Sequence, residues 1–243
     1  MYKIGMAVWS PWRGCHKFSR GCDHCYIHRA DIHRHIDTNE IIKTDSFDSP
    51  IQKKKKNTYV MKPNQCVYVC FQSDFLIEEA DVWRTECWKM IKERSDLTFL
   101  FLTKRITRFL SCIPADWNDG YENVVVSCTV EDQTSADERL SLFMRLPIKH
   151  KNIVCQPLLE PVTISQYLQG IDLVVVGGES GKNTRPMDFD WVMHIQAERV
   201  SANVDFTFRQ ASSRFIKDGQ MYEISPKMLT QQARKANIDY KKI

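Results

Sequence analysis

The chain has 243 residues, a formal net charge of +4 and a pI of about 8.5. This length suffices for one large α/β domain or two small ones, and 43% hydrophobic with 26% charged residues is ordinary for a soluble globular protein. The mild positive charge does not by itself indicate nucleic-acid binding. No apolar run approaches the roughly 18 residues of a membrane span, and the N-terminal sequence has no extended apolar stretch typical of a signal peptide. We therefore expect a cytoplasmic protein without membrane association.

Seven short apolar runs are typical of buried parallel strands. In chain order they are Ile4–Trp9, Val67–Phe71, Leu97–Leu102, Val124–Cys128, Ile153–Gln156, Leu173–Val176 and Val204–Phe208. Most are separated by helical patterns, over Glu78–Arg94, Ile106–Ser111, Ser135–Arg145, Thr163–Leu168 and Asp190–Val200. This alternation predicts a parallel α/β fold. A series of this length fits a partial TIM-like (β/α) barrel of about six to seven parallel strands better than a closed barrel of eight.

One segment, 31–62, interrupts this alternation. It is polar, has little apolar periodicity and contains the run Lys53–Lys56. We interpret it as an insertion after the first strand and its cysteine loop, within a single domain over residues 1–243. The four lysines indicate either a solvated surface or a contact with a polyanion such as nucleic-acid phosphate, and the sequence leaves both open.

The nine cysteines fall into two groups. Three of them, Cys15, Cys22 and Cys25, form a C-x6-C-x2-C motif directly after the first predicted strand. Three thiolates leave one iron of a four-iron cluster open to a small molecule, whereas a structural site is normally closed. A zinc site completed by His24 or His28 is the alternative that the spacing allows. The other six lie in or near apolar stretches and are expected to be buried free thiols: Cys66, Cys70, Cys87, Cys112, Cys128 and Cys155.

Polar residues follow each later apolar run, as expected where ligands bind at the C-terminal ends of parallel strands. They are Gln72-Ser73-Asp74, Thr103-Lys104-Arg105, Ser127 with Glu131, Gln156 with Glu160, Gly177-Gly178-Glu179-Ser180 and Arg209-Gln210. Each alone could be a helix cap or a loop residue, but together they describe a polar rim. Lys104, Arg105, Arg185 and Arg209 predict an anionic substrate if they point inward, and a solvated surface if they do not.

Three clustered cysteines in a loop after the first strand of a partial barrel resemble the radical S-adenosylmethionine (SAM) superfamily. The common spacing there is C-x3-C-x2-C, so the first gap is longer in this chain. Over nearly its whole length the chain is similar to a phage-associated, largely uncharacterised branch of radical-SAM-like proteins. The motifs that carry this similarity are Gly14-Cys15 to Cys25-Tyr26, Ser73-Asp74-Phe75, Leu102-Thr103-Lys104-Arg105, Ser127 with Glu131-Asp132-Gln133, Ala136-Asp137-Glu138-Arg139, Pro157-Leu158-Leu159-Glu160-Pro161, Gly177-Gly178-Glu179-Ser180-Gly181, Arg185-Pro186-Met187 and Arg209-Gln210.

The resemblance implies that Cys15, Cys22 and Cys25 hold a [4Fe–4S] cluster whose open iron binds SAM. It also implies reductive cleavage of SAM to a 5′-deoxyadenosyl radical, which abstracts hydrogen from a substrate. The basic rim residues indicate that this substrate is anionic, such as a nucleotide, a nucleic acid or a carboxylate-bearing small molecule. An electron donor such as a flavodoxin or ferredoxin follows from the need for one electron. A zinc-binding, nucleic-acid-interacting protein and a non-catalytic barrel scaffold are the alternatives.

The resemblance and the rim together predict the site residues. In the superfamily a Gly-Gly-Glu motif often follows the second strand; here it follows the sixth predicted strand, and Ser73 and Asp74 hold the second-strand position. The candidate cofactor-binding residues are Tyr26, Ser73, Asp74, Ser127, Glu131, Glu160, Gly177, Gly178, Glu179 and Ser180. The candidate substrate-binding residues are Lys104, Arg105, Arg185, Arg209 and Gln210.

Overall fold

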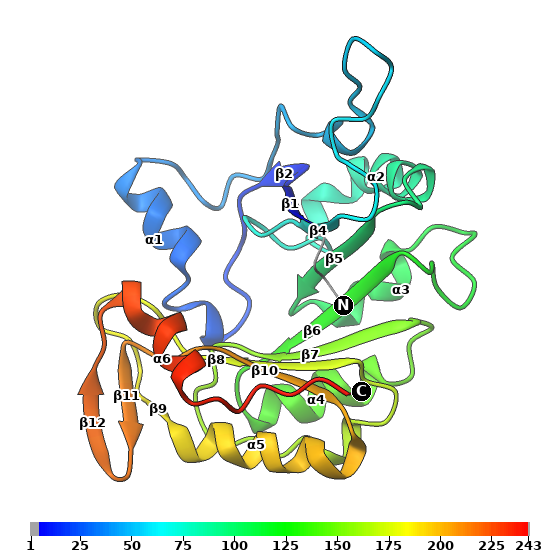
Figure 1. Cartoon of the computed structure of the whole chain (residues 1–243). Helices are drawn as coiled ribbons and strands as arrows, with labels where there is room; N and C mark the ends of the chain where they lie inside the picture. The colour runs from blue at the N-terminus through cyan, green and yellow to red at the C-terminus, as the bar shows by residue number, and fades with distance from the viewer. Residues whose placement is uncertain (1–4, 243) are drawn as a thin grey trace. The chain divides into compact units, whose positions relative to one another are not determined.

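The computed structural model describes residues 5–242, and its main sheet has seven strands in the order β1-β4-β5-β6-β7-β8-β10 (Figure 1). The strands are β1 (Met6–Trp9), β4 (Cys66–Val69), β5 (Thr98–Thr103), β6 (Val124–Val130), β7 (His150–Cys155), β8 (Leu173–Gly177) and β10 (Asp205–Gln210). The pairs β1–β4, β4–β5, β7–β8 and β8–β10 are parallel. The fold is therefore α/β, with the strand order of a partial (β/α) barrel, as predicted. Each predicted strand is present, although Ile4 of the first lies outside the described residues.

Four of the five predicted helices are present. They are α2 (Asp81–Glu93), α3 (Phe109–Cys112), α4 (Gln133–Phe143) and α5 (Phe189–Ala202). Helix α4 begins at a capping box in which the Asp132 side chain accepts from the Ser135 backbone N–H. The predicted helix Thr163–Leu168 is only a 3₁₀ turn, Ser165–Tyr167, because three residues cannot develop the regular i to i−4 bonding of an α-helix.

Several short elements were not predicted. They are α1 (Tyr26–His33), α6 (Leu229–Lys235), the pair β2 (Trp12–Arg13) and β3 (Ile42–Lys43), and the small sheet of β9 (Met187–Asp188), β11 (Arg214–Lys217) and β12 (Gln220–Glu223). The polar segment 31–62 therefore contains some regular structure, including β3 and the 3₁₀ turn Ser49–Ile51. None of the helices between residues 5 and 242 has the length and apolar character needed to cross a membrane.

The chain divides into two compact units, which are described separately. The first holds Met1–Lys17, Ala30–Ser127 and Leu146–His150, and the second holds Phe18–Arg29, Cys128–Arg145 and Lys151–Ile243. The first unit has an aromatic core in which Trp88 packs edge-on against Phe75 and Trp117 at 5.1 and 5.2 Å between ring centroids. In the second unit, α5 runs along the sheet below β10 (Figure 1) and buries Val192 and Ile195.

Candidate functional site

The cysteine motif begins in the first unit, on a segment fixed by Trp12. The Trp12 ring is fully buried, stacks on Phe75 and donates its Nε1–H to the Asp74 carbonyl at 3.3 Å. Gly14 follows with φ +91°, and a Cβ there would lie 2.2 Å from the Glu40 carbonyl oxygen. Only glycine fits this position, since L side chains disfavour this φ and the space is filled.

Side chains that follow β4 and β5 bond the first part of the motif. Ser73 Oγ donates to the Gly14 carbonyl, and Arg105 Nη2 donates to the His16 carbonyl at 2.9 Å. Asp74, 5% exposed, accepts from Thr103 Oγ1 at 2.9 and 3.0 Å and pairs with Arg105 at 3.4 Å. Ser73, Asp74 and Arg105 thus form a support for the loop backbone. The predicted roles of Ser73 and Asp74 toward SAM, and of Arg105 toward substrate, stay predictions.

The second unit holds the other part of the motif through two arginines. Arg20 pairs with Glu160 at 3.2 Å and with Asp132 at 3.6 Å. Arg185 bonds the buried carboxylate of Glu179 and donates to the Arg20 carbonyl at 2.8 Å. The carboxylates of Glu160 and Glu179 are therefore occupied by arginines, and Arg185 acts on the loop. Sequence reasoning missed Arg20, whose partners lie more than 100 residues away.

A buried ion pair lies beneath this part of the loop. Glu131, fully buried, accepts from Arg139 Nη1 at 2.8 Å and from Nη2 at 3.2 Å. A Cβ on Gly21 would lie 3.1 Å from Glu131 Cδ, and the Arg139 guanidinium lies 5.4 Å from the Phe18 ring centroid. The bidentate pair satisfies both buried charges, so Glu131 supports the loop at Gly21.

The two glycines at the end of β8 have a packing reason. A Cβ on Gly178 would lie 2.5 Å from the Ser212 backbone nitrogen, and one on Gly177 would lie 2.7 Å from Gln156 Cδ. Gln210 Nε2 donates to the Gly178 carbonyl at 2.8 Å, and Ser212 Oγ donates to the Glu179 carbonyl at 3.3 Å. Close packing explains both glycines without a ligand, and their predicted cofactor role stays a prediction.

Four other predicted site residues lie as follows. Ser127 is buried in the middle of β6, because this strand extends two residues beyond its predicted end, to Val130. Lys104 and Ser180 are half-buried. Arg209 is an exposed residue near the end of β10.

Tyr26 follows the last cysteine of the motif and begins α1. The pKa of its hydroxyl is raised, first because protein surrounds it in place of water and then because of the neighbouring Cys25, while Arg209 opposes the rise. The side chain still has 55% of its surface exposed. Cys25 and Arg209 thus have opposite effects on the pKa of the Tyr26 hydroxyl within the second unit.

None of the nine cysteines, all of which lie in the described residues, forms a disulfide, and burial separates them as predicted. Cys15, Cys22 and Cys25 are half-buried, and the six outside the motif are buried. Cys15 belongs to the first unit, and Cys22 and Cys25 belong to the second. Among residues 5–242 there is no group of three or more His, Cys, Asp or Glu side chains arranged to hold a metal ion.

Two buried polar atoms beside Cys22 and Cys25 find no hydrogen-bond partner within the described part of the chain. They are Ser19 Oγ and Arg29 Nη1. Arg29 lies one helical turn after Cys25, to whose carbonyl its backbone N–H donates at 3.2 Å. A Cβ on Gly181 would lie 2.5 Å from Arg29 Nη1, so the glycine leaves room for the guanidinium. Unsatisfied buried donors in native proteins call for an explanation such as a bound group. Arg29 Nη1 is therefore a buried donor that an anionic group could satisfy.

Comparisons with known proteins identify the family without a function. No curated protein and no solved structure was found to match the chain. The family model described as "Protein of unknown function (DUF5131)" matches residues 3–238, nearly the whole chain. The chain therefore belongs to the DUF5131 family.

Proposed function

We propose that this protein is a radical SAM enzyme in which Cys15, Cys22 and Cys25 hold a [4Fe–4S] cluster with one iron open to SAM. One observation carries the proposal: side chains that follow strands of the main sheet bond both parts of the cysteine loop. Arg105, after β5, bonds His16, and Arg185, after β8, bonds Arg20. Ligands of parallel (β/α) folds bind at the C-terminal ends of the strands, so these bonds from strand-end side chains support a cofactor role for the loop.

The residues of the chain have distinct parts in this function. When bound, the cluster and SAM supply a one-electron reductive cleavage that starts hydrogen abstraction from the substrate. The three cysteines bind the cluster as thiolates. Arg105 and Arg185 donate hydrogen bonds to carbonyls of the loop that carries these cysteines. Arg29 offers a buried donor to an anionic group, and an Arg–carboxylate pair would satisfy it.

The proposed substrate is anionic, a nucleotide or nucleic acid. Arg209 supports this choice, because it is an exposed cation near the C-terminal end of β10, where ligands of parallel (β/α) folds bind. Arg105 and Arg185 do not add to the argument, since their guanidinium groups bond the loop and the carboxylates of Asp74 and Glu179. A flavodoxin- or ferredoxin-type donor is the proposed redox partner.

Anaerobic reconstitution tests the proposal. The protein is loaded with iron and sulfide, reduced with dithionite and mixed with SAM, and 5′-deoxyadenosine is measured by mass spectrometry. We expect the wild type and the control Cys112→Ala to form it, and Cys22→Ala to lose both cluster iron and product. Cys112 is a matched control because it is a buried free thiol outside the motif.

Two outcomes would contradict the proposal and favour an alternative. Stoichiometric zinc without iron after reconstitution would favour a zinc-binding, nucleic-acid-interacting protein. A stable cluster with no measurable SAM binding would favour a non-catalytic scaffold. Both are read by metal analysis and by calorimetry with SAM, independently of turnover.

A further inference from the structure

Residues 52–60 form a small hairpin, here called the lysine hairpin. Lys53 and Tyr59 form an antiparallel bridge, and Lys54 N–H donates to the Thr58 carbonyl at 2.8 Å. The turn closes where Asn57 N–H donates to the Lys54 carbonyl at 2.9 Å, with Asn57 at φ +57°. Asparagine tolerates this left-handed conformation better than most residues. The sequence therefore places Lys54, Lys55 and Lys56 in one defined turn.

Arg94, at the end of α2, fixes the base of the lysine hairpin. Its guanidinium is fully buried and donates to the carbonyls of Pro50 and Met61, the latter at 2.9 Å. These two residues flank the hairpin on either side. The same guanidinium lies 4.0 Å from the centroid of the Tyr59 ring, and the Tyr59 hydroxyl donates to Glu93 at 2.7 Å. Both ends of the hairpin are therefore attached to the C-terminal end of α2.

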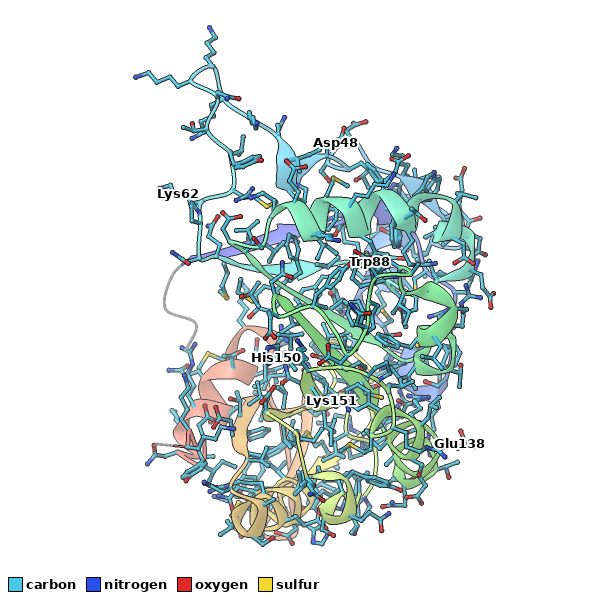
Figure 2. The ribbon with its side chains drawn as sticks, turned by 90° about the vertical axis from the view of Figure 1, so that its right-hand side faces the viewer. Asp48, Lys62, Trp88, Glu138, His150 and Lys151 are labelled. Atoms are coloured by element: carbon cyan, nitrogen blue, oxygen red, sulfur yellow. The ribbon has the colours of Figure 1, made fainter. Side chains whose placement is uncertain are left out.

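The charged side chains at the tip of the lysine hairpin, residues 54–57, are all lysines. Lys54, Lys55 and Lys56 are exposed and form no ion pair with any residue in the described range. In Figure 2 the chain between Asp48 and Lys62 rises away from α2, the helix that carries Trp88. Holding like charges close together is electrostatically unfavourable, so folding stability does not account for a fixed turn of lysines. A partner of opposite charge does.

We propose that the lysine hairpin binds the phosphate backbone of duplex nucleic acid. Ammonium groups bind phosphates without reading sequence, and released counterions drive the association. Duplex is favoured over single strands because the tip has no free aromatic ring on which a base could stack. The Tyr59 ring is covered by Arg94 and by Lys53, whose Nζ lies 5.0 Å from its centroid. This inference goes beyond the proposed function, since such binding requires neither cluster nor SAM.

A membrane surface fits the lysine hairpin less well. Stable membrane binding takes a second signal besides a basic cluster, such as an acyl chain or an inserted apolar side chain. Residues 52–58, Gln-Lys-Lys-Lys-Lys-Asn-Thr, include no apolar side chain, and the exposed Val60 lies at the base of the hairpin, away from the lysines of the turn. The anionic partner with the better fit is therefore nucleic acid.

The test measures binding of the full chain to a short fluorescent duplex by anisotropy, over a series of salt concentrations. The variant is the triple substitution Lys54→Gln, Lys55→Gln and Lys56→Gln. The matched control makes the same charge change at three other exposed lysines, through Lys227→Gln, Lys241→Gln and Lys242→Gln. All six side chains are exposed, so both variants should fold, and their thermal unfolding verifies it.

We expect the hairpin variant to bind the duplex about tenfold or more weaker, with the slope of log K against log salt reduced by up to about 2.7, the value for three phosphate contacts. The control should keep most of the affinity and slope. Equal losses in both variants would overturn the proposal, since net charge alone would then explain binding. So would a loss seen only with vesicles of anionic lipid and not with duplex.

Failure of this proposal is distinguishable from failure of the proposed function. The same titration with Cys22→Ala should give wild-type duplex binding, because the hairpin does not involve the motif. If duplex binding holds while SAM cleavage fails, only the enzymatic proposal falls. If SAM cleavage holds while the lysine substitutions leave duplex binding unchanged, only the hairpin proposal falls.

Discussion

The thiols outside the motif differ chemically from those within it. Burial raises the pKa of Cys70, Cys87 and Cys155, so these groups stay protonated at neutral pH and react poorly with electrophiles or metals. Cys15, Cys22 and Cys25 are partly accessible. Accessibility therefore separates the three proposed ligands from the six structural cysteines.

Alkylation of the native, cluster-free protein tests this separation. Iodoacetamide should modify Cys15, Cys22 and Cys25, located by peptide mass spectrometry, and the six buried cysteines only after unfolding. Reconstitution with iron and sulfide should protect the same three. Native labelling of Cys70 or Cys128 at a comparable rate would show that burial does not control reactivity here.

Arg29 permits a second test at a single residue. Its Nη1 is a buried donor without a partner among the described residues, and such a group costs roughly 1–3 kcal/mol. Replacing it with methionine, of similar length and without the donor, should raise the unfolding free energy of the cluster-free chain by about 1 kcal/mol. The same change should weaken SAM binding, measured by calorimetry on reconstituted protein.

The control for this test is Arg34→Met, which changes an exposed arginine of the first unit. It should alter neither stability nor SAM binding by a measurable amount. A clear loss of stability in Arg29→Met would mean that Nη1 has a protein partner in solution, and the reading of Arg29 as an anion-binding group would be wrong.

At the scale of elements, the contribution of the Arg94–Asp96 ion pair, at the base of the lysine hairpin, to folding stability depends on pH. Asp96 accepts from Arg94 Nε and Nη2, both at 2.8 Å, and this hydrogen bonding holds the pKa of the Asp96 carboxyl below its ordinary value of 3.8. Because its pKa is lower in the folded protein, the ionised Asp96 carboxylate stabilises the fold at pH values above its ordinary pKa. This stabilisation is lost as the pH falls through the folded-state pKa.

Urea unfolding from pH 6 to pH 3 of wild type and Asp96→Asn measures this contribution. The variant should be less stable near pH 6, and the difference should shrink below about pH 4, where the wild-type carboxyl becomes protonated. Asp218→Asn, at an exposed turn, should follow the wild type throughout. If the free energies of unfolding of Asp96→Asn and wild type differed by the same amount at every pH, ionisation of Asp96 would be ruled out as the cause of the difference.

The sequence predicted the elements whose signal is local. Continuous apolar runs identified all seven strands. A strand covered on both faces, such as β6, needs apolar side chains at successive positions, although β1 leaves Met6 and Val8 exposed. The 3₁₀ turn at Ser165–Tyr167 was mistaken for a helix, since a short apolar pattern does not reveal its length. The strand β12 was missed because its side chains are exposed, and β11 was missed because it is short and has only two apolar residues, Phe215 and Ile216.

The site was predicted in composition but not in its pairings. The sequence placed Glu160 and Glu179 among the candidate cofactor-binding residues and Arg105 and Arg185 among the candidate substrate-binding residues. It could not show that Arg185 pairs with Glu179 and bonds Arg20, a contact across 165 positions. Charge along the chain does not specify which opposite charge a side chain meets. Arg105 and Arg185 bond carbonyls of the loop, and their predicted contact with substrate stays a prediction.

For the whole molecule, the two units are interleaved along the sequence. Strand β6 contributes Val124–Ser127 to the first unit and Cys128–Val130 to the second. Unfolding either unit alone would therefore break a strand shared with the other. We expect a single cooperative transition despite the division into two units.

Two optical probes can check this cooperativity. Five of the six tryptophans lie in the first unit, and Trp191 lies in the second. In a Trp191→Phe variant, fluorescence reports on the first unit alone, whereas far-UV circular dichroism reports on both. The two denaturant curves should superimpose. Separate midpoints would show that the units unfold independently.

The bond from Arg185 to the Arg20 carbonyl also has a consequence for biosynthesis. Arg185 is translated 165 positions after Arg20. At about 5–20 residues per second, the ribosome needs roughly ten to thirty seconds to cover this distance. Throughout this interval the nascent chain presents Cys22 and Cys25 without the contact that fixes their loop. A metal taken up at the proposed site would therefore enter an ordered loop only after Arg185 has been synthesised, and until then the thiols of Cys22 and Cys25 meet the cellular thiol pool.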